Sequence, residues 1–469
     1  MGVFFIALYS IAVGLGGIKS SVSGFGTDQF DQKDEKEKAQ MAYFFNRFYF
    51  FISVGTLLAA TVFVYIQDTI GRSWGYGICS ALMFLAIMGF ISGTRRYRYK
   101  KCVGSPIIHV LQVLVAATSK RKLKVPSSVH LLYENSPQES RICRTDQFCC
   151  LDKAAIIATG EVGGTSGSGT ANPSPWKLCS VTRVEEVKMM IRIMPIWATT
   201  IMFWTIHAQM ITFAVQQAAT MERSIGKFQV PAGSFNFFFT GSILITLGVY
   251  DRLVMPLWSK HYGNQGSEVL VAVLFSIRSL LSSMGVKFLL LFCFPSFTSL
   301  QKMGLGLFIS IITMVVAAIV EARRLSVARA MNSSVSTLPI SAFLLVPQFA
   351  LAGAGEGFMY TGQLDFFITQ SPKGMKAIST SLFLTTIALG FFVSSALVAI
   401  VRKVTGGGTR HNWLPHNINN SRLDCFYGFI AVLNAVNLGL YLACAMWYRR
   451  KLNEDAQKME SATNFSSRG

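Results

Sequence analysis

The chain has 469 residues, of which 51% are hydrophobic and only 14% are charged. This composition, with a mean hydropathy of +0.44, excludes a set of soluble domains with water-facing surfaces. The formal net charge of +20 does not indicate nucleic-acid binding, because the basic residues lie beside apolar stretches and not on one amphipathic domain. The chain is therefore expected to be a membrane protein.

Apolar stretches near the length of a bilayer-spanning helix, about 20 residues, recur along nearly the whole chain. They predict an all-α polytopic membrane protein. The predicted spans are 3–24, 43–66, 75–94, 189–215, 232–256, 303–321, 338–361, 377–401 and 425–447.

A further apolar stretch, 268–295, is not counted as a span. If it were one, every later loop would change sides, and the basic run at 447–451 would lie outside the cell. The usual excess of Lys and Arg on the cytosolic side disfavours that arrangement. Without this span, the Asn-x-Ser sequons at 332–334 and 419–421 both fall in outer loops.

One long polar connection, 95–188, separates three spans from six. Basic runs lie directly after the third span and at 119–124, so the connection is predicted to be cytoplasmic. Near its end, Val184, Val187 and Met190 recur at helical spacing with charges between them. This pattern predicts an interfacial helix that leads into the fourth span.

The sequence carries no recognisable catalytic or metal-binding signature. The nine cysteines show neither a disulfide framework nor metal-ligand spacing, and they are expected to be reduced. The sequence contains no zinc-binding His-Glu-x-x-His pattern, no nucleophile elbow and no Walker loop. The chain is not expected to be an enzyme or to hold a cofactor or metal.

Three ionisable residues stand out within the predicted spans: Lys19, His207 and Glu356. An ionisable group inside a membrane is costly and usually faces a cavity or a partner, so each is a functional candidate. A protonated imidazole donates two hydrogen bonds and attracts an anion, and a buried carboxyl can carry a proton. The structural alternatives stay open, namely snorkelling for Lys19 and helix-to-helix hydrogen bonds for the other two.

Several motifs, in order along almost the whole chain, resemble those of plant nitrate/peptide transporters. These transporters form part of the proton-coupled oligopeptide transporter branch of the major facilitator superfamily. The motifs include "GGIKSSVSGFGTDQFD" (16–31), "FFNRFYFFISVGTL" (44–57), "VEEVKMMIRIMPIWAT" (184–199), "YDRLVMPL" (250–257) and "YTGQLDFFITQSPKGMK" (360–376). With "HAQ" (207–209) and "LGFFVSS" (389–395), the chain is most similar to the dual-affinity nitrate transporter subgroup.

The resemblance implies roles for five residues. His207 would bind nitrate, and Phe391 would line the same pocket. Lys19 and Glu356 match a charged pair that is tied to coupling and gating. Ile211 stands where the best-known subgroup member has a pocket threonine, so its affinity for nitrate does not carry over to this chain.

The resemblance also implies a fold of twelve helices in two six-helix bundles. The chain begins at what matches the fourth helix, so the first three helices and their Glu-x-x-Glu-Arg proton-coupling motif are expected to be missing. The stretch 268–295 has no counterpart in relatives and is expected to be translated intron sequence. The expected divisions are an N-terminal bundle remnant, a cytoplasmic central loop, a C-terminal six-helix bundle and a cytoplasmic tail, at 1–94, 95–188, 189–450 and 451–469.

The leading expectation is a proton-coupled nitrate symporter of the plasma membrane that works by alternating access. Its expected partners are nitrate, protons and the lipid bilayer, with a homodimer as a further expectation. Two alternatives stay open: a nitrate sensor or non-transporting truncated form, and a transporter of chloride, a peptide or a hormone. A chain that truly begins at Met1 is expected to show no coupled uptake on its own.

Overall fold

The structure is a computed structural model that describes eleven stretches of the chain. They are 2–30, 34–99, 105–123, 132–135, 141–157, 174–250, 298–331, 337–372, 375–406, 413–415 and 417–466. The apolar stretch 268–295 and the sequon at 332–334 lie outside them, so the expectations for both are untested.

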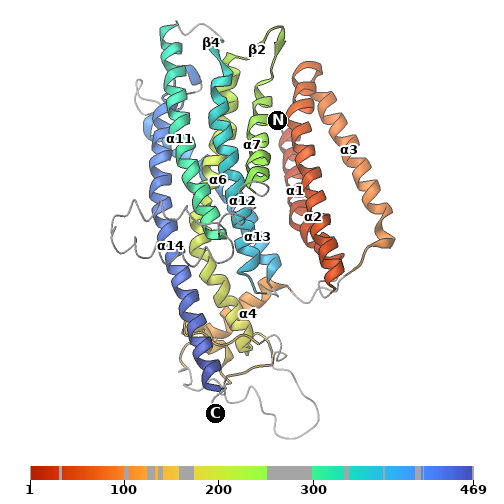
Figure 1. Ribbon diagram of the computed structural model, residues 1–469, viewed down its shortest axis with the longest axis vertical. Helices are drawn as coiled ribbons and strands as arrows, with labels where there is room; N and C mark the ends of the chain where they lie inside the picture. Colours follow the sequence, from red (N-terminus) through yellow and green to blue (C-terminus); the bar gives the residue numbers. More distant parts are fainter. Residues whose placement is uncertain are drawn as a thin grey trace, which may run out of the picture. The chain divides into compact units, whose positions relative to one another are not determined.

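Helices make up most of the described structure (Figure 1). The longer ones are α1 (Gly2–Asp28), α2 (Glu35–Leu58), α3 (Arg72–Ser92), α4 (Pro106–Ser119), α6 (Val181–Ala219), α7 (Asn236–Val249), α11 (Ser299–Ala330), α12 (Val346–Thr369), α13 (Lys376–Thr405) and α14 (Leu423–Ser466). A short helix, α5 (Cys149–Asp152), precedes α6, and two π-helical turns, Ala59–Phe63 and Ile66–Ile70, continue α2.

Eight of the described helical segments are long and apolar enough to cross a membrane. They correspond to all of the predicted spans except 43–66, and the expectation of an all-α polytopic protein is confirmed. The region of that remaining span is helical in α2 and the π-helical turns, but its apolar part, Val54–Ile70, is shorter than a span. The regular α-helix ends at Leu58, where the first π-helical turn begins.

Short strands connect the helices of the C-terminal half. β1 (Met221–Glu222) follows α6 and pairs in parallel with β4 (Leu338–Ser341), which precedes α12. The antiparallel hairpin of β2 (Ser224–Ile225) and β3 (Phe228–Gln229) turns at Gly226, whose φ of 61° is a conformation that favours glycine. The β1–β4 pair therefore brings the end of α6 beside the beginning of α12 (Figure 1).

The chain divides into two compact units. The first unit comprises Met1–Tyr99, Thr199–Asp365 and Thr385–Leu442, and the second comprises Lys100–Ala198, Phe366–Leu384 and Ala443–Gly469. The predicted central loop thus belongs to one unit together with segments of the later helices. The bundle boundaries expected from the family resemblance stay a prediction.

A buried ion pair joins several elements of the first unit. Arg324 on α11 donates two hydrogen bonds to Glu321, at 2.7 and 2.8 Å, and a third to Asn419 Oδ1 at 2.7 Å. Both charged side chains are completely buried. Because its charge is neutralised by Glu321 inside the protein, Arg324 is a structural residue and not a free positive charge at the membrane surface.

The second unit folds around the first turns of α6. Val184 and Val187 are buried in an apolar core with Val113 and Ala116 of α4. The predicted interfacial helix is wrong as a separate element, because α6 runs without interruption from Val181 to Ala219. Its apolar positions face protein and not lipid, so periodicity identified the helix but not what covers it.

A second set of buried charges holds this unit together. Lys188 lies 2.6 Å from Asp152 and 2.7 Å from Glu185, and all three side chains are almost completely buried. Arg144 also pairs with Asp152 at 2.9 Å. Because removing one partner of a buried pair leaves an uncompensated charge, these contacts fix the segment 141–157 onto the beginning of α6.

Candidate functional site

Two of the ionisable residues singled out in the sequence lie side by side in the first unit. His207 on α6 and Glu356 on α12 are mostly buried, and Nδ1 of the imidazole is 3.1 Å from Oε2 of the carboxylate. This oxygen is shielded from solvent and, among the described residues, accepts no well-aligned hydrogen bond. The two groups are therefore close enough to form an ion pair whenever the imidazole is protonated, and one added proton changes the net charge of the pair by one.

Aromatic rings surround the imidazole of His207. The ring of Trp204 lies at 5.4 Å between centroids, that of Phe239 at 5.3 Å and that of Phe391 at 6.2 Å. Trp204 and Phe391 meet the imidazole nearly edge to face, at 71°. The structure thus brings Phe391 to His207, as the resemblance implied, although nothing here tests whether either residue binds a ligand.

Glycines let the helices that carry these residues approach closely. A Cβ at Gly353 on α12 would lie 2.3 Å from the carbonyl oxygen of Phe239 on α7, and one at Gly355 would meet Ile309 of α11 at 3.3 Å. A Cβ at Gly390 on α13 would lie 2.3 Å from Cβ of Trp204. The small residues around Glu356, in "GAGEG" (353–357), are thus packing positions.

Gln363 on α12 holds the indole of Trp204 on α6 in place. Neither residue was predicted to be part of the site. The Trp204 Nε1–H donates to Gln363 Oε1 at 3.1 Å. The amide nitrogen of Gln363 donates to the hydroxyls of Thr200 and Thr386, both at 2.9 Å. All four residues are buried. A glutamine within an apolar span was the available signal, but intramembrane amides also join helices without any other role.

Gln209 is an example of such a joining amide. Its Nε2 donates to the Ser394 hydroxyl on α13 at 2.7 Å and to the Ser394 carbonyl oxygen at 3.2 Å. This contact joins α6 to α13 at Ser394, about one turn after Phe391 on α13.

The structure links the other two predicted site residues, Ile211 and Lys19, less directly to His207 and Glu356. Ile211 lies one helical turn beyond His207 on α6, and therefore on the same face of the helix. Lys19 is exposed on α1 and forms no ion pair with any residue that the structure describes. The basic residue beside Glu356 in this structure is His207 and not Lys19, so the role of Lys19 stays a prediction.

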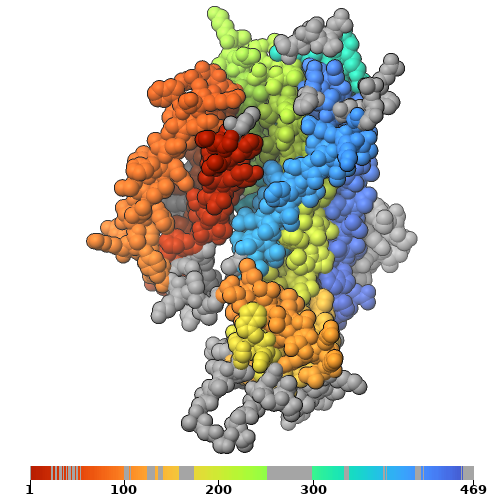
Figure 2. All heavy atoms as spheres, turned by 180° about the vertical axis from the view of Figure 1, so that it is seen from behind, coloured from red at the N-terminus to blue at the C-terminus, as the bar shows by residue number. Residues whose placement is uncertain are grey.

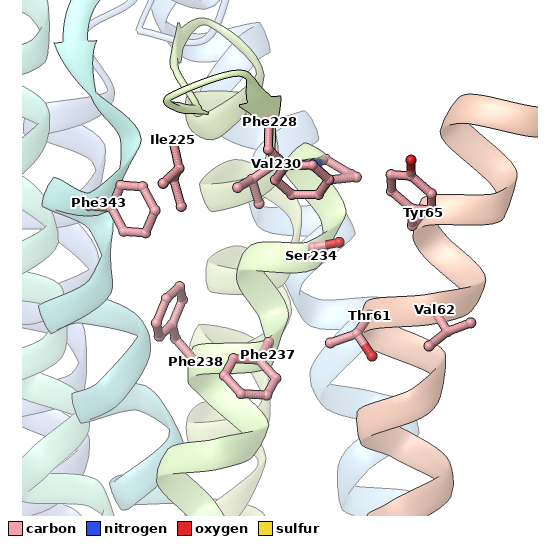
Figure 3. Close-up of a pocket in the computed structure, with 11 residues that line it drawn as sticks. Thr61, Val62, Tyr65, Ile225, Phe228, Val230, Ser234, Phe237, Phe238 and Phe343 are labelled. Atoms are coloured by element: carbon pink, nitrogen blue, oxygen red, sulfur yellow. The ribbon is translucent and has the colours of Figure 1, made fainter.

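An apolar pocket of about 460 Å³ lies elsewhere in the first unit (Figure 3). Its walls come from the end of the α2 region, the β2–β3 hairpin, the beginning of α7 and the segment before α12. The lining residues are Thr61, Val62, Tyr65, Ile225, Phe228, Val230, Pro231, Ser234, Phe237, Phe238 and Phe343. None of the predicted site residues lines it, and it holds no charged group, so it is not the expected anion site.

The described residues contain no group of His, Cys, Asp and Glu side chains that could hold a metal ion. All seven cysteines in these stretches are free thiols. The candidate site therefore consists of the His207–Glu356 pair, its aromatic walls and the hydrogen bonds that fix them.

Comparison with known proteins gives consistent matches. The family model PTR2, described as the POT family, matches residues 1–414. The chain is 55% identical over 466 residues to protein NRT1/PTR FAMILY 6.2 of Arabidopsis thaliana, and the match covers 99% of this chain and 75% of that protein. It is 45% identical over 456 residues to protein NRT1/PTR FAMILY 6.3 of the same plant, covering 95% and 71%.

Solved structures share the fold. The crystal structure of an auto-inhibited POT family peptide transporter superimposes with a TM-score of 0.61 at 20% identity, covering 94% of this chain and 77% of that one. A proton-dependent oligopeptide (POT) family transporter gives a TM-score of 0.52 at 21% identity, covering 93% and 78%. At such identities the likeness concerns the fold alone.

Proposed function

Because the chain belongs to the POT family, whose members are membrane transporters and not enzymes, we propose that it carries nitrate together with protons across the plasma membrane. The relatives in the plant NRT1/PTR family support the general class, a multi-pass membrane transporter. The substrate, the coupling to protons and the location are parts of the proposal. The observation that carries it is the contact between His207 and Glu356.

The charge of this pair decides whether an anion can bind beside it. With the imidazole neutral and the carboxyl ionised, the pair has a negative charge and repels nitrate. One proton brings the pair to neutrality, and a second gives it a positive charge. Because nitrate binds the protonated forms better, protons must by the same coupling bind better when nitrate is present. This reciprocity is what proton-linked anion transport requires.

The orientation of the imidazole leaves one nitrogen for the anion. Nδ1 faces Glu356, so a hydrogen at Nε2 can be donated to a nitrate oxygen. The edges of aromatic rings carry partial positive charge and suit the rim of a planar anion. The apolar walls formed by Trp204, Phe239 and Phe391 also strengthen the electrostatic attraction, because they lower the local dielectric.

The proposal predicts that His207→Ala removes nitrate uptake. Without the imidazole the site has no donor for the anion, and Glu356 keeps an uncompensated negative charge. Uptake of labelled nitrate into oocytes or proteoliposomes should be high at an outside pH of about 5.5, low at about 7.4, and near background at both values in the variant.

The matched control is His109→Ala, since His109 lies on α4 outside the predicted spans and should leave uptake unchanged. Uptake in His207→Ala equal to that of the natural chain would contradict the assigned site. Nitrate binding without any uptake by the natural chain would favour the alternative of a sensor. Uptake of chloride or a peptide in place of nitrate would keep the transporter class but replace the substrate.

A further inference from the structure

The side chain of Trp204 is held at both of its ends in the interior of the first unit. Where it leaves the backbone, it packs against Gly390 of α13, whose Cβ, if it had one, would lie 2.3 Å from Cβ of Trp204. At the far end of the ring, Nε1–H donates to Gln363 of α12. Figure 2 shows α13, in light blue, beside the yellow-green α6. Neighbours on two other helices therefore set the position of the indole.

The hydrogen bonds of Gln363 allow only one orientation of its amide. An indole N–H donates and never accepts, so the amide atom that faces it at 3.1 Å must be the oxygen. The amide nitrogen then donates to the hydroxyls of Thr200 and Thr386, each at 2.9 Å. A turned amide would set its N–H groups against the indole N–H. This would be costly, because all four side chains are buried and an unpaired donor there finds no water.

The indole that Gln363 holds is also a wall of the imidazole. Trp204 and His207 are three residues apart on α6 and therefore lie on the same side of the helix. Their rings meet nearly edge to face, at 5.4 Å and 71°. Nδ1 of the imidazole faces Glu356, so the carboxylate fixes one atom of the ring. The tilt of the ring about that contact, and with it the direction of an Nε2–H bond, depends on the indole.

The direction of this bond matters more for some anions than for others. An oxygen of a planar oxyanion accepts hydrogen bonds best near the plane of the anion, along its lone pairs. A halide is spherical and accepts equally well from every side. A donor held in one direction by its neighbours therefore favours a planar oxyanion, and a donor that is free to tilt loses this advantage.

We propose that Gln363 is a positioning residue, which orients His207 through the indole of Trp204 and so gives the site a preference for a planar oxyanion over a halide. It acts on the site through the indole and without contact to the anion. The preference for an oxyanion rests on the proposed function. The hold of Gln363 on Trp204 and His207 does not, and it can be measured without any anion.

The test compares Gln363→Leu with Gln348→Leu in the full purified chain, labelled with fluorotryptophan. Leucine fills much of the space of glutamine and forms no side-chain hydrogen bond. Gln348 is the matched control, because it is equally buried on the same helix and donates to Gln217 at 3.3 Å. It lies about 22 Å from Gln363 along α12, at a rise of about 1.5 Å per residue.

The fluorine NMR line of Trp204 reports on the indole directly, and it is identified as the line that is missing from Trp204→Phe. In the natural chain it should be narrow and should shift with pH as His207 gains a proton. In Gln363→Leu it should broaden or split, and its response to pH should weaken. Gln348→Leu should lower the Tm as Gln363→Leu does, but it should leave the Trp204 line unchanged.

Calorimetry with nitrate and with chloride measures the effect on the site. Gln363→Leu should raise the Kd for nitrate several-fold and the Kd for chloride less, whereas Gln348→Leu should change neither. In a chain that already carries Trp204→Phe, the further change Gln363→Leu should have no effect on the Kd for nitrate, because the indole that transmits it is gone.

Four results would overturn the proposal. An unchanged Trp204 line in Gln363→Leu would mean that the amide does not hold the indole. A broadened line with the natural response to pH would mean that the indole does not orient His207. Equal changes in Gln348→Leu would trace the effect to lost stability. Equal losses of nitrate and chloride affinity would contradict the preference for an oxyanion.

The proposed function can fail separately from this inference. A natural chain that binds no nitrate would contradict the proposed function and, with it, the preference for an oxyanion. The Trp204 line and its response to pH would still decide whether Gln363 orients His207.

Discussion

Glu356 and His207 share one ionic contact, but the loss of each should have a different effect. The imidazole is the only one of the two that can donate a hydrogen bond to an anion when the carboxyl is ionised. In the proposed mechanism, the carboxylate gives the site a negative charge when no proton is bound. Under that proposal, substitutions at the two positions separate the loss of nitrate binding from the loss of pH dependence.

We predict that Glu356→Gln keeps nitrate binding but weakens the dependence of uptake on pH. Glutamine has nearly the shape of the carboxyl but cannot ionise, so the site is never negatively charged and only a proton on His207 still changes its charge. The ratio of uptake at about pH 5.5 to that at about pH 7.4 should fall but stay above about 1. Nitrate affinity can be measured on the purified variant by calorimetry.

Asp365→Asn is the control for that experiment, since Asp365 lies on the same helix and accepts a hydrogen bond from Ser299 at the surface. It should leave the pH ratio intact. A Glu356→Gln chain that keeps the natural pH ratio would show that another group carries the coupled proton.

The sequence supplied part of this site and could not supply the rest. His207 and Glu356 were found because polar groups inside spans are rare and costly. Phe391 came only from the family resemblance. Trp204 and Phe239 were missed because an aromatic residue in an apolar span is equally suited to lipid, and only the approach of α7 and α13 shows which rings face the imidazole.

At the scale of the helices, the contact between α6 and α13 is set by one glycine. Trp204 and Thr205 leave no room for a side chain at Gly390. A Cβ placed there would lie 2.3 Å from Cβ of Trp204, 2.8 Å from its carbonyl carbon and 3.0 Å from the backbone nitrogen of Thr205. A larger residue must push the two helices apart. This movement would also displace the neighbouring Phe391 from His207.

We therefore predict that Gly390→Ala destabilises the protein by about 1–3 kcal/mol, the usual cost of overpacking. Gly439→Ala on α14 is the control, because a Cβ there meets nothing within 4 Å. Thermal unfolding in detergent should give a lower Tm for Gly390→Ala than for Gly439→Ala. Equal values would mean that the helices separate without cost.

The helices themselves were predictable from the sequence, but their ends and surroundings were not. Four of the six C-terminal spans, 189–215, 303–321, 377–401 and 425–447, each fall within one helix, since a long apolar run has no other way to satisfy its backbone in lipid. The span 338–361 instead begins in β4, and 232–256 extends past α7 beyond the described residues. The beginning of α6 was misjudged because Val184 and Val187 have the same spacing whether they face lipid or α4. Whether such a residue faces lipid or protein depends on contacts with segments far away in the chain, which its own spacing does not show.

For the molecule as a whole, the cysteines provide a test of sidedness. Cys149 and Cys150 are exposed and Cys179 is buried, all within the connection predicted to be cytoplasmic. Burial raises the pKa of the Cys179 thiol, which lowers the fraction of reactive thiolate at neutral pH. Its Sγ–H also donates to the carbonyl oxygen of Pro175 at 3.2 Å.

A membrane-impermeant maleimide should therefore modify Cys149 and Cys150 in inside-out vesicles but not in right-side-out vesicles. Cys179 should react in neither until the protein is unfolded. Mass spectrometry of the digested protein measures each site separately. Modification of Cys149 from the outer side would reverse the predicted topology, and rapid modification of native Cys179 would contradict the packing of the second unit.

The overall class was predictable because composition and motifs extend over the whole chain. The POT family match and the similar solved structures confirm the expected fold. The absence of three earlier helices, the nature of 268–295, the subgroup and the homodimer stay predictions. The composition of the two compact units could not be foreseen, since contacts inside the second unit include buried charges, such as Lys188 and Asp152, that resemble surface residues in the sequence.

The pairing of His207 with Glu356 also imposes an order on biosynthesis. Helix α6 is synthesised before α7, α11 and α12, so His207 is made long before its partner Glu356. The contact between the two side chains can therefore form only after α12 has been made. The polar centre of the first unit is completed late, and a chain that ends before α12 has a histidine without this carboxylate beside it.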